Sequence, residues 1–150
     1  MTHGNAREIA LKHFANRFNC SESTLMGLAE AFGIKERCIP RIATGLGGGL
    51  GGCGDSCGAL TGAAMAISLK FGRESAEDLE SKTLCYHKVR QLVEAFEKEF
   101  GSARCIDLIE VDMRTPEGMA RARELDLHNK VCPAFVGFAA DMAQRLIEEG

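Results

Sequence analysis

A chain of 150 residues with 45% apolar and 26% charged residues has the composition of an ordinary globular protein and is long enough for one domain with a sizeable core. The net charge of −3 excludes the basic surface that nucleic acid or an anionic membrane attracts, and no stretch resembles a signal peptide or a membrane span. We therefore expect a single cytoplasmic domain over residues 1–150 that neither binds nucleic acid nor inserts into membranes.

Hydrophobic periodicity predicts helices in the first part of the chain. Residues 5–18 and 20–32 each carry an apolar stripe at helical spacing, with Asn5 and Asn19 as N-caps and Gly33 as the glycine that ends the second helix. Residues 36–44 predict a short helix that is interrupted near a proline.

The next segment, residues 45–62, reads GLGGGLGGCGDSCGALTG. Asp55 is predicted to cap a helix that runs to about Lys70 and consists of small residues, which allow another helix backbone to approach closely. The segment before Asp55 is interpreted as a glycine loop.

The second half of the chain also favours helices. Residues 75–100 carry the longest apolar stripe, and residues 102–112 are assigned to a helix because no second strand candidate exists for pairing. Thr115–Pro116 marks another helix start, and the last helix begins at Cys132–Pro133. The expected fold is therefore all-α, a compact single-domain bundle of about six to eight helices with a glycine-rich loop.

Seven cysteines are the outstanding feature of the composition. An odd number cannot pair completely within one chain, and a reducing cytosol disfavours structural disulfides. Cysteines in this setting are packing residues, metal ligands or redox-active thiols.

Four of the cysteines fall at predicted helix N-termini, namely Cys20, Cys57, Cys105 and Cys132. The N-terminal end of a helix carries a partial positive charge and free N–H donors, so we expect lowered thiol pKa values there and a reactive or ligating role. Cys38 and Cys85 are interpreted as packing residues. Cys53 lies four residues before Cys57, a spacing that suits a metal site or a disulfide, and its role stays open.

Several familiar motifs are absent or lack their context. The glycines of residues 47–52 match G-x-G-x-x-G, but a helix rather than a strand precedes them, so dinucleotide binding is not supported. No Cys-x-x-Cys-His is present, and haem is therefore not expected. The histidines lack metal-binding spacing and are interpreted as solvated or core residues: His3, His13, His87 and His128.

The segment Cys57–Gly62 is a CGAxxG motif, preceded by the glycine run 47–49 and by Cys20, and followed by the single cysteines Cys105 and Cys132. This order resembles the C_GCAxxG_C_C family, whose members are described as redox-active proteins without an assigned reaction, and the resemblance extends from about Asn19 to Val136. It implies that the four cysteines named above are the family cysteines. The family's relationship to part of the split-Soret cytochromes, where an iron–sulfur cluster is found, implies a ligating role.

Our first hypothesis is a redox-active protein, either an oxidoreductase or an electron-transfer protein, in which the four cysteines converge. They would bind an iron–sulfur cluster or cycle between dithiol and disulfide. We expect the glycine loop to approach this site closely, with Cys53 as an optional further metal ligand and four glycines as candidate cofactor-binding residues: Gly47, Gly48, Gly49 and Gly58.

Two alternatives stay open. One is a structural zinc site in a scaffold protein, with zinc ranked second to an iron–sulfur cluster as cofactor. The other is a thiol enzyme for a small anion at the glycine loop, with Cys57 as nucleophile. The redox partner is unknown, and the small-residue helix fits a homodimer as well as packing within one chain.

Overall fold

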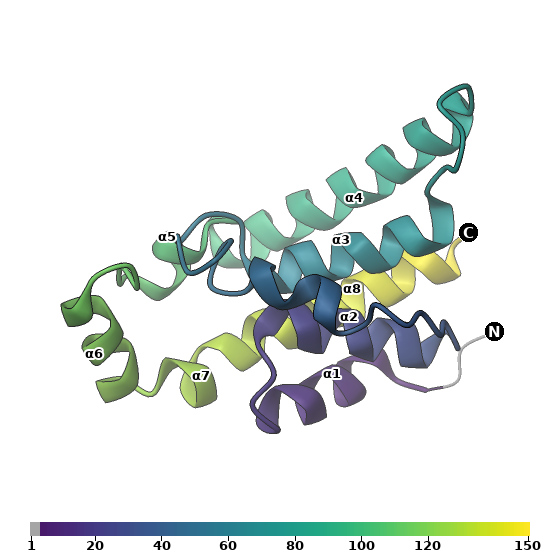
Figure 1. Ribbon diagram of the computed structural model, residues 1–150. Helices are drawn as coiled ribbons and strands as arrows, with labels where there is room; N and C mark the ends of the chain where they lie inside the picture. Colours follow the sequence, from purple (N-terminus) through teal and green to yellow (C-terminus); the bar gives the residue numbers. More distant parts are fainter. Residues whose placement is uncertain (1–3) are drawn as a thin grey trace.

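The computed structural model describes residues 4–150, and this range consists of helices and loops without a strand (Figure 1). The all-α prediction is thereby confirmed, while His3 lies outside the described residues. Eight α-helices and one 3-10 helix, η1, follow in this order: α1 (Ala6–Ala15), α2 (Cys20–Ala31), η1 (Arg41–Leu46), α3 (Gly58–Phe71), α4 (Leu79–Phe100), α5 (Cys105–Ile109), α6 (Pro116–Glu124), α7 (Leu127–Lys130) and α8 (Cys132–Glu148).

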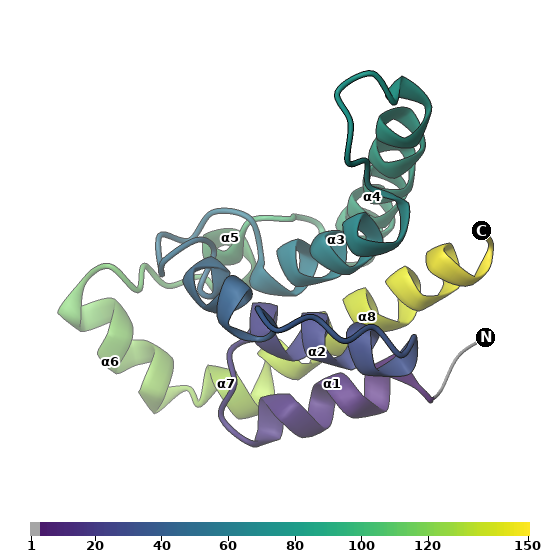
Figure 2. The same cartoon turned by 45° about the vertical axis from the view of Figure 1, so that its right-hand side comes forward.

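Five longer helices form the bundle. Helix α2 packs between α1 and α3, α8 packs against all three, and α4 lies against α3 and α8. The short helices α5, α6 and α7 lie at one end of this bundle, opposite the end that carries the chain termini (Figures 1 and 2). The molecule therefore has a regular helical region, here called the bundle (α1–α4 and α8), and an irregular end formed by loops and short helices.

The core of the bundle is apolar and includes an aromatic cluster. Phe96 is fully buried, with its ring centroid 4.8 Å from that of Phe100 and 6.0 Å from that of Phe135. Lys88 is also buried, and its ammonium donates a hydrogen bond to the carbonyl of Leu146 at 2.7 Å. This bond satisfies a charge that would otherwise be costly to bury, and it joins α4 to the last turn of α8.

Local capping signals predict several helix boundaries correctly. Asn19 caps α2 in a full capping box with Glu22, and Thr115 caps α6, whose first residue is Pro116. Asp55, in contrast, does not cap α3, because residues 55–57 extend toward the segment before α5 and the helix begins only at Gly58. Helix α4 begins at Leu79, where Asp78 accepts the capping hydrogen bond.

The small residues of α3 allow the close approach that the sequence predicts. A Cβ atom at Gly62 would collide with the backbone carbonyl of Ser21 in α2. Gly27 of α2 allows α1 to approach equally closely, because a Cβ there would lie 2.7 Å from the Cβ of Ala10. The backbones of neighbouring helices therefore touch directly at these two positions.

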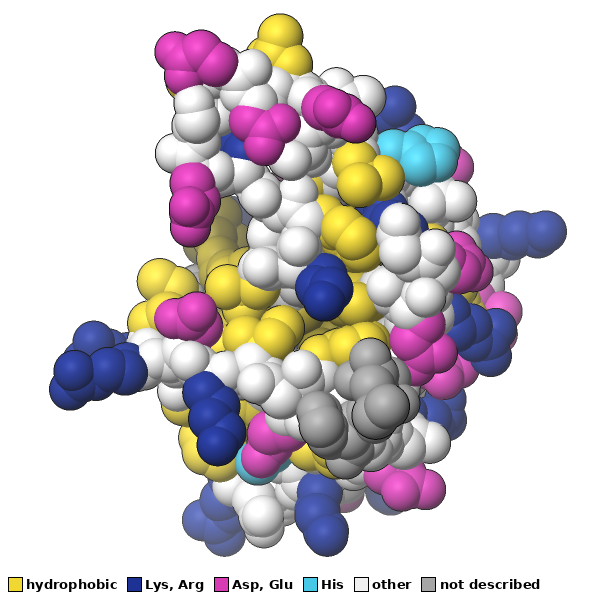
Figure 3. Space-filling view, turned by 90° about the vertical axis from the view of Figure 1, so that its right-hand side faces the viewer, with side chains coloured by type: hydrophobic (Ala, Val, Ile, Leu, Met, Phe, Trp, Pro, Cys, Tyr) yellow, Lys and Arg dark blue, Asp and Glu magenta, His cyan; other side chains and the backbone are white. Residues whose placement is uncertain are grey.

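Charged side chains surround an apolar band on the face that carries the chain termini (Figure 3). Within residues 4–150, none of the helices combines the length and the apolar character needed to traverse a bilayer.

Candidate functional site

Four helix N-termini carry the four cysteines that the sequence singles out. Cys20, Cys105 and Cys132 are the first residues of α2, α5 and α8, and Cys57 is the N-cap residue of α3. The predicted placement at helix ends is thus confirmed by the secondary structure.

These four cysteines line one small cavity of about 20 Å³, here called the inner cavity, together with Leu108, Ile109 and Phe135. The side chains around it contain no nitrogen or oxygen that could compete as a ligand. Cys57 and Cys105 are buried, whereas Cys20 and Cys132 are half-buried. Four thiols distant in sequence therefore converge on one apolar space.

A larger cavity of about 410 Å³, here called the outer cavity, shares Cys20, Cys105 and Cys132 with the inner one. Cys57 lines only the inner cavity. The other residues of the outer cavity are Phe14, Asn19, Gly48, Ile109, Met113, Met119, Ala122, Arg123, Asp126, Leu127 and His128.

Backbone hydrogen bonds join the two segments that carry Cys57 and Cys105. The Cys57 N–H donates to the carbonyl of Ala103 at 2.8 Å, and the Cys105 N–H donates to that of Asp55 at 2.7 Å. The Ile106 N–H adds a bond of 2.9 Å to Gly54. The position of these two thiols is therefore set by main-chain pairing.

Glycine residues make space for the cysteines. A Cβ atom at Gly58 would collide with the Cys20 sulfur. At Gly49, with a φ of +72°, a Cβ would lie 2.7 Å from the Cβ of Cys105 and 2.6 Å from the backbone nitrogen of Asp55. Only glycine fits at these two positions, which agrees with the expected close approach of the glycine loop to the thiols.

The backbone also surrounds the Cys20 sulfur with N–H groups. Burial raises the pKa of this thiol, and the N–H groups of Gly48, Ser21, Cys20 itself and Gly58 oppose that rise. Gly48 and Gly58 belong to the predicted cofactor-binding glycines. Gly47 lies against the side chain of Asn19, which caps the helix that begins at Cys20.

The expectation of lowered thiol pKa values is wrong for this arrangement. Burial raises the pKa of Cys105 to about 11 and that of Cys132 to about 12, and the nearby Cys20 sulfur adds to both rises. Burial, followed by the influence of Cys20, likewise raises the pKa of Cys57. Loss of water around a thiolate thus outweighs the favourable helix ends, and the thiols are protonated at neutral pH unless a cation neutralises them.

The remaining cysteines lie apart from this set. Cys85 is buried in the core, as expected, with its sulfur 3.5 Å from the hydroxyl of Ser68. Cys38 is exposed, contrary to the packing interpretation, and Cys53 is exposed on the glycine loop. Neither Cys38 nor Cys53 lines the inner or the outer cavity.

The outer cavity is the part of the site that the sequence analysis missed. His128, interpreted as solvated or core, stacks on Phe14 with ring centroids 3.8 Å apart and donates from Nε2 to the Phe14 carbonyl at 2.9 Å. The sequence signal at Thr115–Pro116 locates α6 but contains no information on where that helix lies. Only the docking of α6 and α7 beside the cysteines creates the cavity.

The donor set is suited in its chemistry to an iron–sulfur cluster, because cysteine thiolates bind such clusters and sulfur is the sole ligand type around the inner cavity. Within residues 4–150, no three His, Cys, Asp or Glu side chains are grouped so that they could hold one metal ion. The thiols therefore match an iron–sulfur cluster by ligand type, as they would zinc, but the part of the chain that the structure describes holds no preformed site for a metal ion.

Comparison with protein-family models matches residues 18–146 to the family described as "Putative redox-active protein (C_GCAxxG_C_C)". The curated proteins and the solved structures contain no match to this chain.

Proposed function

The chain belongs to the C_GCAxxG_C_C family, described as redox-active, and on this premise we propose that Cys20, Cys57, Cys105 and Cys132 form a single redox centre. The observation that supports this proposal is their convergence on the inner cavity, where sulfur is the sole potential ligand. Residues 18–146 of the family match include all four of them.

In the first form of this centre, the four thiolates bind an iron–sulfur cluster, which would supply one-electron transfer. The raised pKa values belong to the metal-free site and are compatible with this form, because a bound cluster would supply the positive charge that thiolates lack there. Four thiolates in an apolar space repel one another and lack water, so they require a cation to be stable. The backbone N–H groups near Cys20 would stabilise negative charge on that sulfur.

The second form is dithiol/disulfide cycling, favoured by the small volume of the inner cavity, about 20 Å³. Two thiols would lose two protons to solvent and two electrons to an acceptor as the S–S bond forms. The raised pKa values disfavour rapid exchange, because the thiolate is the attacking species. The same argument counts against Cys57 as the nucleophile of a small-anion enzyme, since Cys57 is buried.

Anoxic purification followed by visible spectroscopy, iron and sulfide assays and thiol titration tests the proposal. We expect iron and sulfide in the wild type and their loss in each serine variant of the four cysteines. Cys38→Ser and Cys53→Ser, at exposed positions away from the cavities, are the matched controls and should retain both.

A metal-free protein that loses two titratable thiols on mild oxidation would select the dithiol form. A colourless, metal-free protein whose thiol content does not respond to oxidation would overturn the redox centre altogether.

A further inference from the structure

The outer cavity has the size and position of a small-molecule site. Its volume of about 410 Å³ falls within the usual range of ligand pockets, and three of the four family cysteines line it. A small molecule in this cavity would therefore lie beside Cys20, Cys105 and Cys132.

The walls of the outer cavity favour an aromatic ligand. Phe14, Met113 and Met119 lie around it, with Ile109, Ala122 and Leu127 completing the apolar lining. Methionine side chains are flexible and polarisable, and their sulfur atoms make favourable contacts with aromatic rings. The volume is large enough for a molecule of about two fused aromatic rings.

The side chain of Arg123 offers the outer cavity a partner for an anionic substituent. Arg123 lines the cavity, and its guanidinium forms no ion pair with any residue in the described range. The Asp126 carboxylate also lines the cavity and keeps its negative charge, and it accepts a hydrogen bond from the Asn129 amide at 2.8 Å. The Nε2 of His128 is already used in its hydrogen bond to the Phe14 carbonyl. Arg123 is therefore the side chain of this lining whose guanidinium can hold an anionic group.

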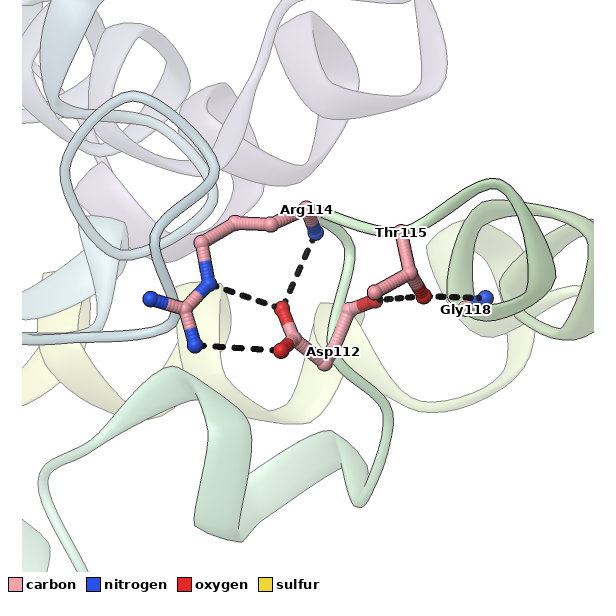
Figure 4. Close-up of polar contacts among 4 residues, drawn as sticks. All are labelled: Asp112, Arg114, Thr115 and Gly118. Atoms are coloured by element: carbon pink, nitrogen blue, oxygen red, sulfur yellow. Dashed lines mark hydrogen bonds and ion pairs between the residues drawn. The ribbon is translucent and has the colours of Figure 1, made fainter.

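Hydrogen bonds within the turn that precedes α6 fix the start of the helix that carries Arg123 (Figure 4). The Arg114 guanidinium donates two hydrogen bonds of 3.0 Å to the Asp112 carboxylate. The Thr115 hydroxyl donates to the Asp112 carbonyl at 3.0 Å and accepts from the Gly118 N–H at 2.9 Å. A Cβ at Gly118 would collide with that same carbonyl, so the turn that leads into α6 is close-packed.

We propose that the outer cavity binds a small aromatic anion, a planar molecule of about two fused rings with one acidic group held by Arg123. The binding of this ligand is independent of the proposed function. Its role as substrate or electron partner of the cysteine centre rests on the proposed function.

The test is an NMR titration of the reduced, anoxic full-length protein with naphthalene-2-sulfonate, a redox-inert anion of this class. We expect saturable shifts at residues that line the outer cavity, with a dissociation constant between about 10 µM and about 1 mM. Arg123→Gln should weaken binding by about two- to fivefold, as expected for an exposed ion pair. Ala122→Phe, which fills the cavity, should abolish it while leaving the spectrum of the bundle unchanged.

Arg121→Gln is the matched control, because Arg121 is an exposed arginine of the same helix, 3.4 Å from Glu124 and outside the cavity lining. It should bind the probe as the wild type does. Uncharged 2-naphthol should bind wild type and Arg123→Gln equally, since it does not present a sulfonate to the guanidinium. An absence of saturable shifts, shifts away from the cavity, or sulfonate binding that is insensitive to Arg123→Gln would overturn the proposal.

Cys57→Ser separates this inference from the proposed function. Cys57 lines only the inner cavity, so the variant should lose the redox centre and still bind the probe. If the wild type has the proposed redox centre but does not bind the probe, the ligand site is refuted and the proposed function stands. Probe binding by a protein without redox activity would refute the proposed function alone.

Discussion

The bundle and the cysteine end are stabilised by different physical means. The cysteine end comprises α5–α7 and residues 47–57, that is, the glycine loop followed by the extended residues 55–57. Side chains fill the bundle, where Phe96 and Leu92 are fully buried. At the cysteine end, glycines and main-chain hydrogen bonds determine the path of the backbone. Examples are the close contact at Gly49 and the bond from the Cys105 N–H to the Asp55 carbonyl. Substitutions in the bundle should therefore change stability, and those at the cysteine end should change the environment of the thiols.

Phe96→Ala should produce the largest loss of stability. It removes a fully buried ring from the aromatic cluster and should lower the free energy of unfolding by about 3–5 kcal/mol. Urea denaturation monitored by circular dichroism measures the loss. Tyr86→Ala, at a 60% exposed position of the same helix, should change stability by less than about 0.5 kcal/mol. An equal effect of both changes would contradict the assignment of the core.

Gly49→Ala tests the cysteine end. Its Cβ would lie 2.6 Å from the Asp55 backbone and 2.7 Å from the Cβ of Cys105, at a φ of +72°. We expect a cost of about 2–4 kcal/mol and faster alkylation of Cys105 by N-ethylmaleimide, measured by mass spectrometry.

The matched control for Gly49→Ala is Gly52→Ala, where φ is +77° and no atom lies within 4 Å of the added Cβ. It should cost only the left-handed backbone strain, about 1–2 kcal/mol, and leave Cys105 protected. If Cys105 is alkylated equally fast in both variants, close contact with the loop does not position this cysteine.

A pair of N-cap residues allows a helix start at the thiols to be compared with one away from them. Asn19 caps α2 at Cys20 and lines the outer cavity, whereas Asn5 caps α1 and does not line it. Each change to alanine should cost about 1 kcal/mol of stability. Only Asn19→Ala should also increase the alkylation rate of Cys20, and a rate that is the same in both variants would show that the cap does not protect this thiol.

The smallest expected effect is a change in the pH dependence of stability. Burial raises the pKa of Cys132 from 9.0 to about 12, so folding keeps this thiol protonated while the unfolded chain loses its proton. The stability that it contributes is complete below pH 9.0 and declines as the pH rises toward about 12.

Cys132→Ser should therefore make the loss of stability of the metal-free, reduced protein shallower above pH 9.0. Urea unfolding from about pH 8 to about pH 11 measures this slope. Cys53→Ser, at an exposed thiol, should retain the wild-type slope. A Cys132→Ser slope that is as steep as that of the wild type would indicate that this thiol titrates alike in both states.

What the sequence determines by itself here is local. The capping box at Asn19, the Thr115–Pro116 start and the glycine after α4 depend on interactions within a few residues, so they are readable from the chain. The same signals place four cysteines at helix N-termini. The prediction at Asp55 is wrong because the pairing of Ser56 with Arg104, far away in sequence, keeps this segment extended.

Tertiary structure alone determines which thiols lie together and in which direction their pKa values shift. Cys20 and Cys132 are far apart in the chain and share a cavity only because α2 and α8 pack together. Burial in that cavity reverses the expected direction of the pKa shifts, since desolvation depends on atoms from the whole fold while the helix dipole depends on one helix. The outer cavity likewise requires α6 and α7 to dock beside the cysteines, a placement that no local sequence signal specifies.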